Sequence, residues 1–316
     1  MPADLIPLGK TDIQITPLGI GTWQWGDRVM WGYGKTYTDA DVQAAFQTSL
    51  DHGLNWFDTA EVYGLGISER LLGQYVRAVK GETAAAPAPL VATKFFPFPW
   101  RLTKAQFRRT LKGSLNRLGM KCVDLYQIHW PFPPVSIETW AEALADAVSD
   151  GLIRSAGVSN YNLEQMLRAD IALGKRGVPL ASNQVPYSLL DRRVERSGLL
   201  SQCVQRGITL IAYSPLAQGM LSGKYTPEKP PSGIRARRYN PAYLAKIQPL
   251  VQLLRQIGQE YGKTPSQVAL NWVVCKSAVP IPGARNARHA EENAAAIGWR
   301  LTAEQVAALD RASDQL

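Results

Sequence analysis

The sequence predicts an α/β fold in which eight parallel strands and their covering helices form a (β/α)8 barrel of the TIM type. Short apolar runs alternate with longer segments of helical period along the whole chain, which is typical of a parallel sheet covered by helices. Eight such units occur within 316 residues, the number that closes one barrel. A doubly wound open sheet is the structural alternative. We therefore expect residues 1–316 to form a single domain.

The expected strands are short and apolar, and helical segments lie between them. The strands span residues 18–23, 54–58, 90–95, 123–130, 153–159, 181–185, 208–214 and 278–282. Helical segments include residues 40–53, 103–119, 136–151 and 162–177. In a barrel of this kind, the carboxyl ends of all strands open onto one face. Polar residues at the strand ends are therefore expected to meet there.

Three further segments fall outside the repeating units. Residues 5–19 predict an N-terminal β-hairpin that turns at Gly9-Lys10 and plugs the bottom of the barrel. Residues 301–313 predict an extra C-terminal helix. The connection at residues 216–243, after the seventh strand, is unusually long, and loops of this length are usually functional lids or disordered. On a barrel it would lie on the face that carries active sites.

Composition is that of an ordinary soluble protein. Apolar residues make up 46% and charged residues 19% of the chain. No run approaches the roughly 20 apolar residues of a membrane span, and the first residues lack the pattern of a secretion signal. Cys122, Cys203 and Cys275 are odd in number and far apart, which favours reduced thiols. We expect a cytoplasmic protein that does not bind membranes.

The distribution of charged residues and of histidines argues against two classes of ligand, nucleic acids and metals. The net charge is +9, but the only dense basic group is Arg235, Arg237 and Arg238. Nucleic-acid binding needs a clustered basic face. We therefore expect this local positive charge to bind a small anionic ligand. His52, His129 and His289 have no metal-ligand spacing, and no HExxH or CxxC motif is present. We therefore expect no nucleic-acid partner and no metal.

Four polar side chains at consecutive strand ends suggest carbonyl chemistry. Asp58 ends the second strand, Tyr63 follows in its loop, and Lys94 and His129 end the next two strands. Singly, each has an ordinary structural explanation, such as a helix cap for Asp58. Together they would make the tyrosine a general acid. The lysine cation stabilises the phenolate that the tyrosine leaves behind, and the aspartate holds the lysine in position. A neutral histidine orients the carbonyl oxygen that receives the proton. Hydride transfer would then require a nicotinamide cofactor.

Aromatic residues follow the ends of several strands. The group includes Phe95, Phe96, Phe98 and Trp100, together with Trp25 and Trp130. Such residues are equally compatible with the core and with the wall of a substrate pocket. The candidate substrate contacts are Trp25, Tyr63, Phe95, His129 and Trp130.

Long motifs spread over the chain resemble those of the aldo-keto reductase family. They are GIGTWQWG, NWFDTAEVYGLGISE, VATKF, DLYQIHWP, IRSAGVSNY, NQVPYSLLDR, IAYSPLAQGMLSGKY and IPGARNARHAEEN. The similarity is to a bacterial and plant branch that includes pyridoxal reductase-like and channel β-subunit-like proteins. It implies an NADPH-dependent reductase of aldehydes, and of some ketones, with Tyr63 as the general acid. Lys94 and Asp58 would assist Tyr63, and His129 would orient the substrate.

The resemblance also implies a set of cofactor contacts. Residues after the fifth and sixth strands would hold the carboxamide group of the nicotinamide. The nicotinamide ring would stack on a tyrosine. The phosphates of the cofactor would lie in the long loop and beside IPGARN. The implied residues are Gly21, Thr22, Trp23, Ser159, Asn160, Gln184, Tyr213, Ser214, Leu216, Leu221, Gly223, Lys224, Arg235, Gly283, Arg285, His289, Glu292 and Asn293. One departure concerns Ala284, whose side chain cannot hydrogen-bond a 2′-phosphate. Arg285 would supply the charge instead.

A second class of function is also compatible with the sequence. An interaction or redox-sensing protein, similar to a channel β-subunit, can retain the same four polar residues. The absence of a long N-terminal extension favours the enzyme. Neither the physiological carbonyl substrate nor the oligomeric state follows from the sequence.

Overall fold

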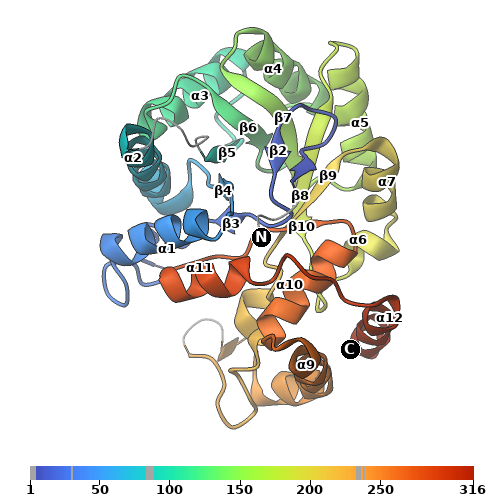
Figure 1. The fold of residues 1–316 in the computed structure, drawn as a ribbon. Helices are drawn as coiled ribbons and strands as arrows, with labels where there is room; N and C mark the ends of the chain where they lie inside the picture. Colours follow the sequence, from blue (N-terminus) through green and yellow to red (C-terminus); the bar gives the residue numbers. More distant parts are fainter. Residues whose placement is uncertain (1–4, 30, 83–88, 233–235, 238) are drawn as a thin grey trace.

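Eight parallel strands form the centre of the molecule in the computed structural model, which describes residues 5–29, 31–82, 89–232, 236–237 and 239–316. Their order is β10-β9-β8-β7-β6-β5-β4-β3 (Figure 1). Each overlaps the range expected from the sequence. The strands are β3 (Ile20–Gly21), β4 (Trp56–Asp58), β5 (Leu90–Phe95), β6 (Val123–Ile128), β7 (Ile153–Ser159), β8 (Leu180–Pro186), β9 (Thr209–Tyr213) and β10 (Val279–Pro280).

The sheet closes on itself where the first strand meets the last. Gly21 forms a parallel bridge with Gly283, and its N–H donates to the carbonyl of Pro282 at 3.0 Å. A Cβ on Gly21 would lie 2.9 Å from the carbonyl oxygen of Ile281, so glycine permits the close approach of the two chains. This closure confirms the predicted barrel.

Helices cover the outside of the sheet. They are α1 (Asp39–Asp51), α2 (Ile67–Glu82), α3 (Lys104–Leu118), α4 (Ile137–Ser149), α5 (Leu163–Gly174), α6 (Arg193–Arg196), α7 (Leu199–Arg206), α9 (Pro241–Tyr261), α10 (Pro265–Cys275), α11 (Ala287–Ala294) and α12 (Ala303–Asp314). Local sequence fixes their limits: Thr103 with Gln106 forms a capping box at the start of α3, and Gly119 ends it with φ 64°. No helix of the described residues is long and apolar enough to cross a membrane.

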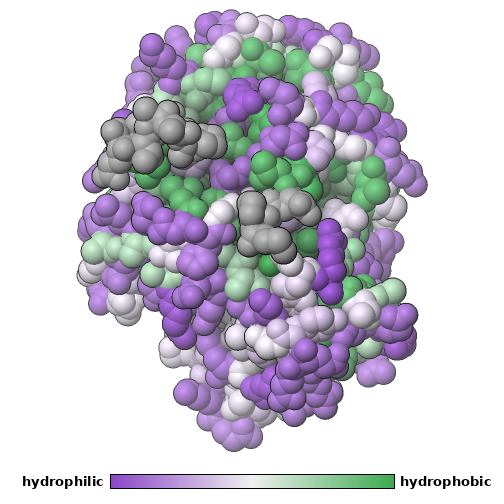
Figure 2. Space-filling view, viewed as in Figure 1, coloured by the Kyte–Doolittle hydropathy of each residue, from purple (hydrophilic) through white to green (hydrophobic). Residues whose placement is uncertain are grey.

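The N-terminal hairpin covers one end of the barrel, as predicted. Strands β1 (Ile6–Pro7) and β2 (Gln14–Ile15) pair antiparallel. Leu8, Ile13 and Ile15 are buried in one cluster with apolar residues from inside the barrel. Figure 1 looks onto this end of the barrel. Figure 2, from the same side, shows hydrophilic residues over much of the surface, with apolar residues between them.

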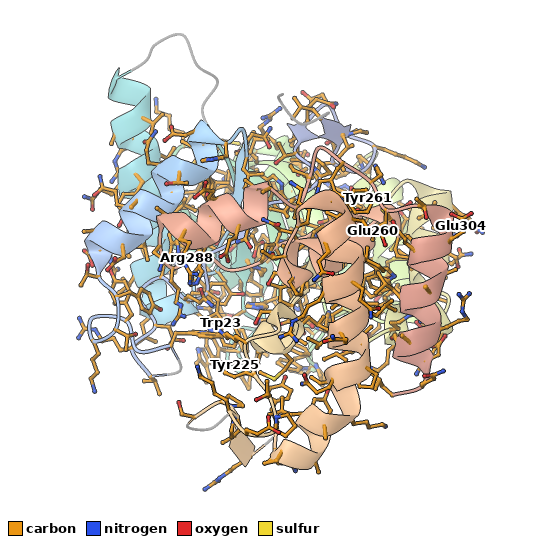
Figure 3. All side chains as sticks on the ribbon, turned by 60° about the horizontal axis from the view of Figure 1, so that its bottom comes forward. Trp23, Tyr225, Glu260, Tyr261, Arg288 and Glu304 are labelled. Carbon is orange, nitrogen blue, oxygen red and sulfur yellow. The ribbon has the colours of Figure 1, made fainter. Side chains whose placement is uncertain are left out.

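The predicted C-terminal helix, α12, packs against α9 and α10. Trp272 Nε1 in α10 donates to Asp310 Oδ1 at 2.9 Å, and Lys276 Nζ donates to Asp310 Oδ2 at 2.9 Å. The Tyr261 hydroxyl at the end of α9 donates to Gln305 Oε1 at 2.8 Å. Figure 3 shows Tyr261 and Glu260 on α9 next to this helix.

The long connection after β9 carries its own small core. It begins with a short 3-10 segment, η2 (Ala217–Ser222). Met220 and Tyr239 from the connection pack with Leu244, Ile247 and Val251 of α9. Arg235 and Arg238, two of the three arginines of the basic group, lie outside the described residues.

Candidate active site

The four candidate catalytic residues come from neighbouring strand ends at the open mouth of the barrel. Asp58 is the last residue of β4, Lys94 lies in β5, and His129 directly follows β6. Tyr63 begins the 3-10 segment η1 (Tyr63–Gly66) after β4. Because adjacent parallel strands end on the same side, the structure brings all four side chains together.

Lys94 and Asp58 form a buried ion pair at the base of the site. Lys94 Nζ donates to Asp58 Oδ1, and to the carbonyl of Thr59 at 2.8 Å. Both residues are at most 1% exposed. Burial lowers the pKa of Lys94, and the Asp58 carboxylate acts in the opposite direction. A buried ion pair is tolerated when its remaining hydrogen-bonding groups are satisfied.

Two glutamines satisfy the second oxygen of Asp58. Gln184 Nε2 donates to Asp58 Oδ2 at 2.9 Å, and Gln127 Nε2 donates to the same oxygen at 3.1 Å. Gln127 is not among the site residues expected from the sequence. A signal was present, because Gln127 lies two residues before His129, and residues two apart in a strand share one face.

Tyr63 lies between the Lys94 ammonium and the His129 ring. Lys94 Nζ is 5.1 Å from the centroid of the Tyr63 ring, and the Tyr63 and His129 rings meet edge to face with centroids 5.9 Å apart. Burial raises the pKa of Tyr63 above its ordinary value, and the Asp58 carboxylate raises it further. The phenol therefore holds its proton at neutral pH, as a general acid must before it donates.

His129 is a buried, neutral imidazole. Only 9% of the residue is exposed, and burial together with the Lys94 cation holds the pKa of His129 well below its ordinary value. Its Nδ1 is buried without a hydrogen-bond partner. A neutral imidazole carries one N–H, which is suited to donating to a carbonyl oxygen in the mouth.

The residues expected at the nicotinamide form an interlocked group beside the site. The Tyr213 hydroxyl donates to Asn160 Oδ1 at 2.9 Å, and Asn160 Nδ2 donates to the carbonyl of His129 at 2.9 Å. Ser159 Oγ donates to the carbonyl of Gln184 at 2.8 Å. Trp23 is 37% exposed, and its ring lies beside the Tyr63 ring with centroids 6.2 Å apart. These residues contact His129 and Tyr63 at the mouth.

Thr22 differs from its neighbours Gly21 and Trp23. Its side chain is fully buried and donates to the carbonyl of Asp58 at 3.0 Å. It also shares a hydrogen bond with Ser68 Oγ at 2.8 Å. The Thr22 hydroxyl therefore ties β3 to the catalytic strand β4.

Cations gather around the first turn of α11. Burial and the positive charges of Arg285, Arg288 and Lys224 lower the pKa of His289 to about 4. The Arg285 guanidinium lies 5.4 Å from the centroid of the Tyr37 ring. Positive charge at a helix N-terminus suits a phosphate group, so these residues fit the charged part of a dinucleotide. Arg288 is labelled on α11 in Figure 3.

The other residues expected at the cofactor lie in the same region. Asn293 Nδ2 donates to the carbonyl of Gly283 at 3.3 Å, and Glu292 pairs with Arg288 at 3.5 Å. Ser214, Leu216 and Gly223 are partly exposed in the loop after β9, whereas Leu221 is buried. Arg235 lies outside the described residues.

An aromatic wall borders the mouth next to His129. We define it as Phe96, Phe98, Trp100, Trp130 and Phe132. The Phe96 ring meets the His129 ring edge to face with centroids 5.6 Å apart. Phe132 stacks on Trp130 with centroids 5.4 Å apart and contacts Phe96. Phe132 is not among the residues expected from the sequence, because its loop has no periodic signal.

Two expected substrate residues lie in the core instead of the wall. Trp25 and Phe95 are fully buried. Trp25 Nε1 donates to the carbonyl of Ala284 at 2.8 Å, and the Phe95 ring packs against Trp140 of α4 with centroids 4.9 Å apart. Because Lys94 points into the barrel, the next side chain of β5 points outward to the helices.

Within the described ranges, no group of three or more His, Cys, Asp or Glu side chains is placed to hold a metal ion. The chemistry available at the mouth is proton donation to an oxygen atom beside aromatic side chains.

Comparisons with family profiles, curated proteins and solved structures all point to the same family. A profile described as "Aldo/keto reductase family" matches residues 17–314. The chain is 41% identical over 310 residues to the chloroplastic pyridoxal reductase of Arabidopsis thaliana, covering 96% of this chain and 84% of the relative. It is 30% identical over 324 residues to the NADH-specific methylglyoxal reductase of Escherichia coli K12, covering 94% of each. An aldo-keto reductase from Klebsiella pneumoniae in complex with NADPH aligns with a TM-score of 0.75 at 29% identity, covering 98% and 95% of the two chains.

Proposed function

We propose that this chain, which belongs to the aldo/keto reductase family, is an NADPH-dependent reductase of aldehydes and of some ketones, with Tyr63 as its general acid. Membership of the family makes the protein an oxidoreductase that uses a nicotinamide cofactor. The observation that supports the finer proposal is the arrangement of Tyr63 between the Lys94 cation and the neutral His129 ring.

The proposed proton transfer uses groups already held in place. A carbonyl oxygen in the mouth accepts hydrogen bonds from the Tyr63 hydroxyl and the His129 N–H. A nicotinamide cofactor, when bound, would provide the hydride that this chemistry needs. Tyr63 gives its proton to the oxygen, and the Lys94 cation stabilises the phenolate that remains. Asp58 holds Lys94 in position, and Gln127 and Gln184 hold Asp58.

The proposed cofactor contacts divide into two groups. The nicotinamide would stack on Tyr213, with Gly21, Thr22 and Trp23 on its other side and its carboxamide near Ser159, Asn160 and Gln184. The phosphates and adenosine would lie along the loop after β9 and the start of α11, with the contacts Ser214, Leu216, Leu221, Gly223, Lys224, Arg235, Gly283, Arg285, His289, Glu292 and Asn293.

Preference for NADPH is part of the proposal. The 2′-phosphate needs fixed positive charge, and Arg285, Arg288 and Lys224 lie close enough to His289 to lower its pKa. Cofactor choice varies among relatives, because one at 30% identity is named as NADH-specific. The cytoplasmic location, the single-domain organisation and the absence of nucleic-acid and metal ligands stay predictions from the sequence.

Oxidation of NADPH with a simple aromatic aldehyde tests the function, with Tyr63→Phe as the variant. Removing the hydroxyl should lower turnover by about 10²–10⁴-fold, while NADPH still binds. A Tyr63→Phe protein that works at the wild-type rate would contradict the assignment of the acid. A wild type that binds NADPH but consumes it with no aldehyde or ketone would favour the sensor or interaction protein.

A further inference from the structure

An arginine–carboxylate pair joins two turns at the mouth of the barrel. Arg101 Nη2 donates to Glu61 Oε2 at 3.0 Å, and Nη1 donates to Glu61 Oε1. The same pair binds the backbone of Phe96, a residue of the aromatic wall. Glu61 Oε1 accepts from the N–H of Phe96 at 2.7 Å, and Arg101 Nη1 donates to the Phe96 carbonyl at 2.7 Å. We call this arrangement the Glu61–Arg101 clamp.

The clamp is largely buried and packs against two neighbouring aromatic rings. The side chains of Glu61 and Arg101 are 7% and 18% exposed. The Arg101 guanidinium lies 5.2 Å from the Phe95 ring centroid and 5.0 Å from that of Phe98. A planar guanidinium that binds a carboxylate through two bonds and also stacks on aromatic rings has little freedom to move.

The two turns joined by the clamp carry different parts of the site. Glu61 lies two residues before Tyr63, whose N–H donates to the Ala60 carbonyl at 3.1 Å. Phe96 lies on the other turn, and its ring contacts His129. The clamp therefore sets the position of the wall relative to the residues that receive the carbonyl group.

We propose that the Glu61–Arg101 clamp determines substrate specificity by fixing the Phe96 ring beside His129, so that aldehydes bearing a flat apolar ring are preferred to small aliphatic ones. The inference rests on the proposed reductase function. Glu61 and Arg101 are positioning residues, because neither contacts the reacting atoms. The ring of the substrate packs against Phe96, while the carbonyl group occupies the same place for every aldehyde.

The test compares kcat/KM for benzaldehyde and propanal in wild type and Arg101→Ala. A well-placed aromatic contact is worth up to about tenfold in binding. The benzaldehyde-to-propanal ratio should therefore fall by about tenfold in Arg101→Ala, mainly through a higher KM for benzaldehyde. Arg101→Lys keeps the charge but loses the two-bonded geometry, so it should restore the ratio only in part. The Kd for NADPH, from cofactor fluorescence, should stay at the wild-type value.

A matched control lies at the opposite end of the barrel. Arg154 Nη1 donates to Asp124 Oδ1 at 2.8 Å, and Asp124 Oδ2 accepts from the N–H of Val91 at 2.8 Å. Arg154→Ala therefore breaks a pair of similar chemistry that also holds a backbone N–H. It should leave the aldehyde ratio unchanged, and thermal unfolding of both variants accounts for any shared loss of stability.

Phe96→Ala tests whether the clamp acts on specificity through the Phe96 ring. If the clamp acts through Phe96, this variant should reproduce the fall in the ratio, and adding Arg101→Ala should change it little further. Equal losses for both aldehydes in Arg101→Ala, or an unchanged ratio, would overturn the inference while leaving the reductase function intact. A wild type that binds NADPH but reduces no aldehyde or ketone would overturn both.

Discussion

The hairpin end and the mouth of the barrel differ in what fills them. At the hairpin end, Leu8, Ile13 and Ile15 pack against apolar residues from the strands. At the mouth, the corresponding space is occupied by the buried Lys94–Asp58 pair and by a neutral His129 whose Nδ1 has no partner. One end contributes apolar burial, and the other keeps polar groups available for a ligand. Stability and chemistry are thus separated along the barrel axis, as is usual for this fold.

Backbone conformation shows the same contrast. Several non-glycine residues near the mouth have positive φ: Leu65 (55°), Asn160 (62°), Ser214 (51°), Ala217 (47°) and Gln218 (56°). Such conformations cost on the order of 1–3 kcal/mol each and concentrate at functional sites. By contrast, the tight turn of the hairpin uses Gly9, with φ 59°. Positive φ at non-glycine residues is therefore concentrated at the mouth, although Ser277 (φ 61°), just before β10 at the hairpin end, has it too.

The largest expected effect comes from removing the cation at the mouth. Lys94→Met should lower turnover by about 10²-fold or more, because the phenolate of Tyr63 loses its neighbouring positive charge. For the same reason the apparent pKa of the acid should rise in the pH–rate profile. Asp58→Asn should cost less, since it keeps a hydrogen-bond acceptor beside Lys94. Profiles of wild type and Lys94→Met that overlay would rule out this role of Lys94.

Truncation at the hairpin end should affect stability and leave catalysis alone. Ile13 is 1% exposed, and removing a buried isoleucine side chain typically costs about 2–5 kcal/mol. Ile13→Ala should therefore lower the free energy of unfolding in urea by that amount, with kcat unchanged at temperatures where the protein is folded. Ile171→Ala is the control, because Ile171 is 54% exposed and its loss should cost about 0.5 kcal/mol or less. A large fall in kcat for Ile13→Ala would show that the two ends are coupled.

The smallest effect concerns cofactor choice. Arg285→Ala should raise the KM for NADPH by about tenfold, as expected for the loss of one charge-assisted hydrogen bond, and leave the KM for NADH nearly unchanged. Both must be measured at one ionic strength, because salt screens the interaction. Equal losses for the two cofactors would mean that Arg285 shapes the loop and does not bind the 2′-phosphate.

The same variant has a readout that does not depend on activity. The pKa of His289, about 4, is lowered by burial and by neighbouring cations, of which Arg285 has the largest effect. Removing a positive neighbour favours the protonated imidazole, so the pKa of His289 should rise toward its ordinary value in Arg285→Ala. An NMR titration of the three histidines measures this shift. An unchanged pKa would place Arg285 too far away to influence His289.

The fold was predictable because its signals are local. Each strand is a short apolar run between turn-forming residues, and the hairpin and final helix have clear patterns of their own. The four polar residues at the strand ends were also found, since parallel strands bring their ends to one face. The error in placing Phe95 was avoidable: with Lys94 facing inward, strand alternation sends Phe95 outward.

The remaining features depend on contacts that no local pattern encodes. Glu61 and Arg101 lie 40 positions apart and meet only because β4 and β5 are adjacent. The contact between Trp31 and Trp23, with ring centroids 5.6 Å apart, was equally hidden in the sequence. The loop that carries Trp31 has no regular spacing of apolar residues. Loop conformation decides such pairs, and it is set by tertiary packing.

The seam between Gly21 and Gly283 has a consequence for folding. The bridging glycines come from opposite ends of the chain, so closing the seam has a high entropic cost and depends on the strands between them. Trp23 follows one side of the seam and Arg285 follows the other. The proposed cofactor contacts are thus complete only after the last strand docks on the first. We expect a newly made or half-folded chain to have no affinity for the dinucleotide, and the cofactor to stabilise the closed barrel by mass action.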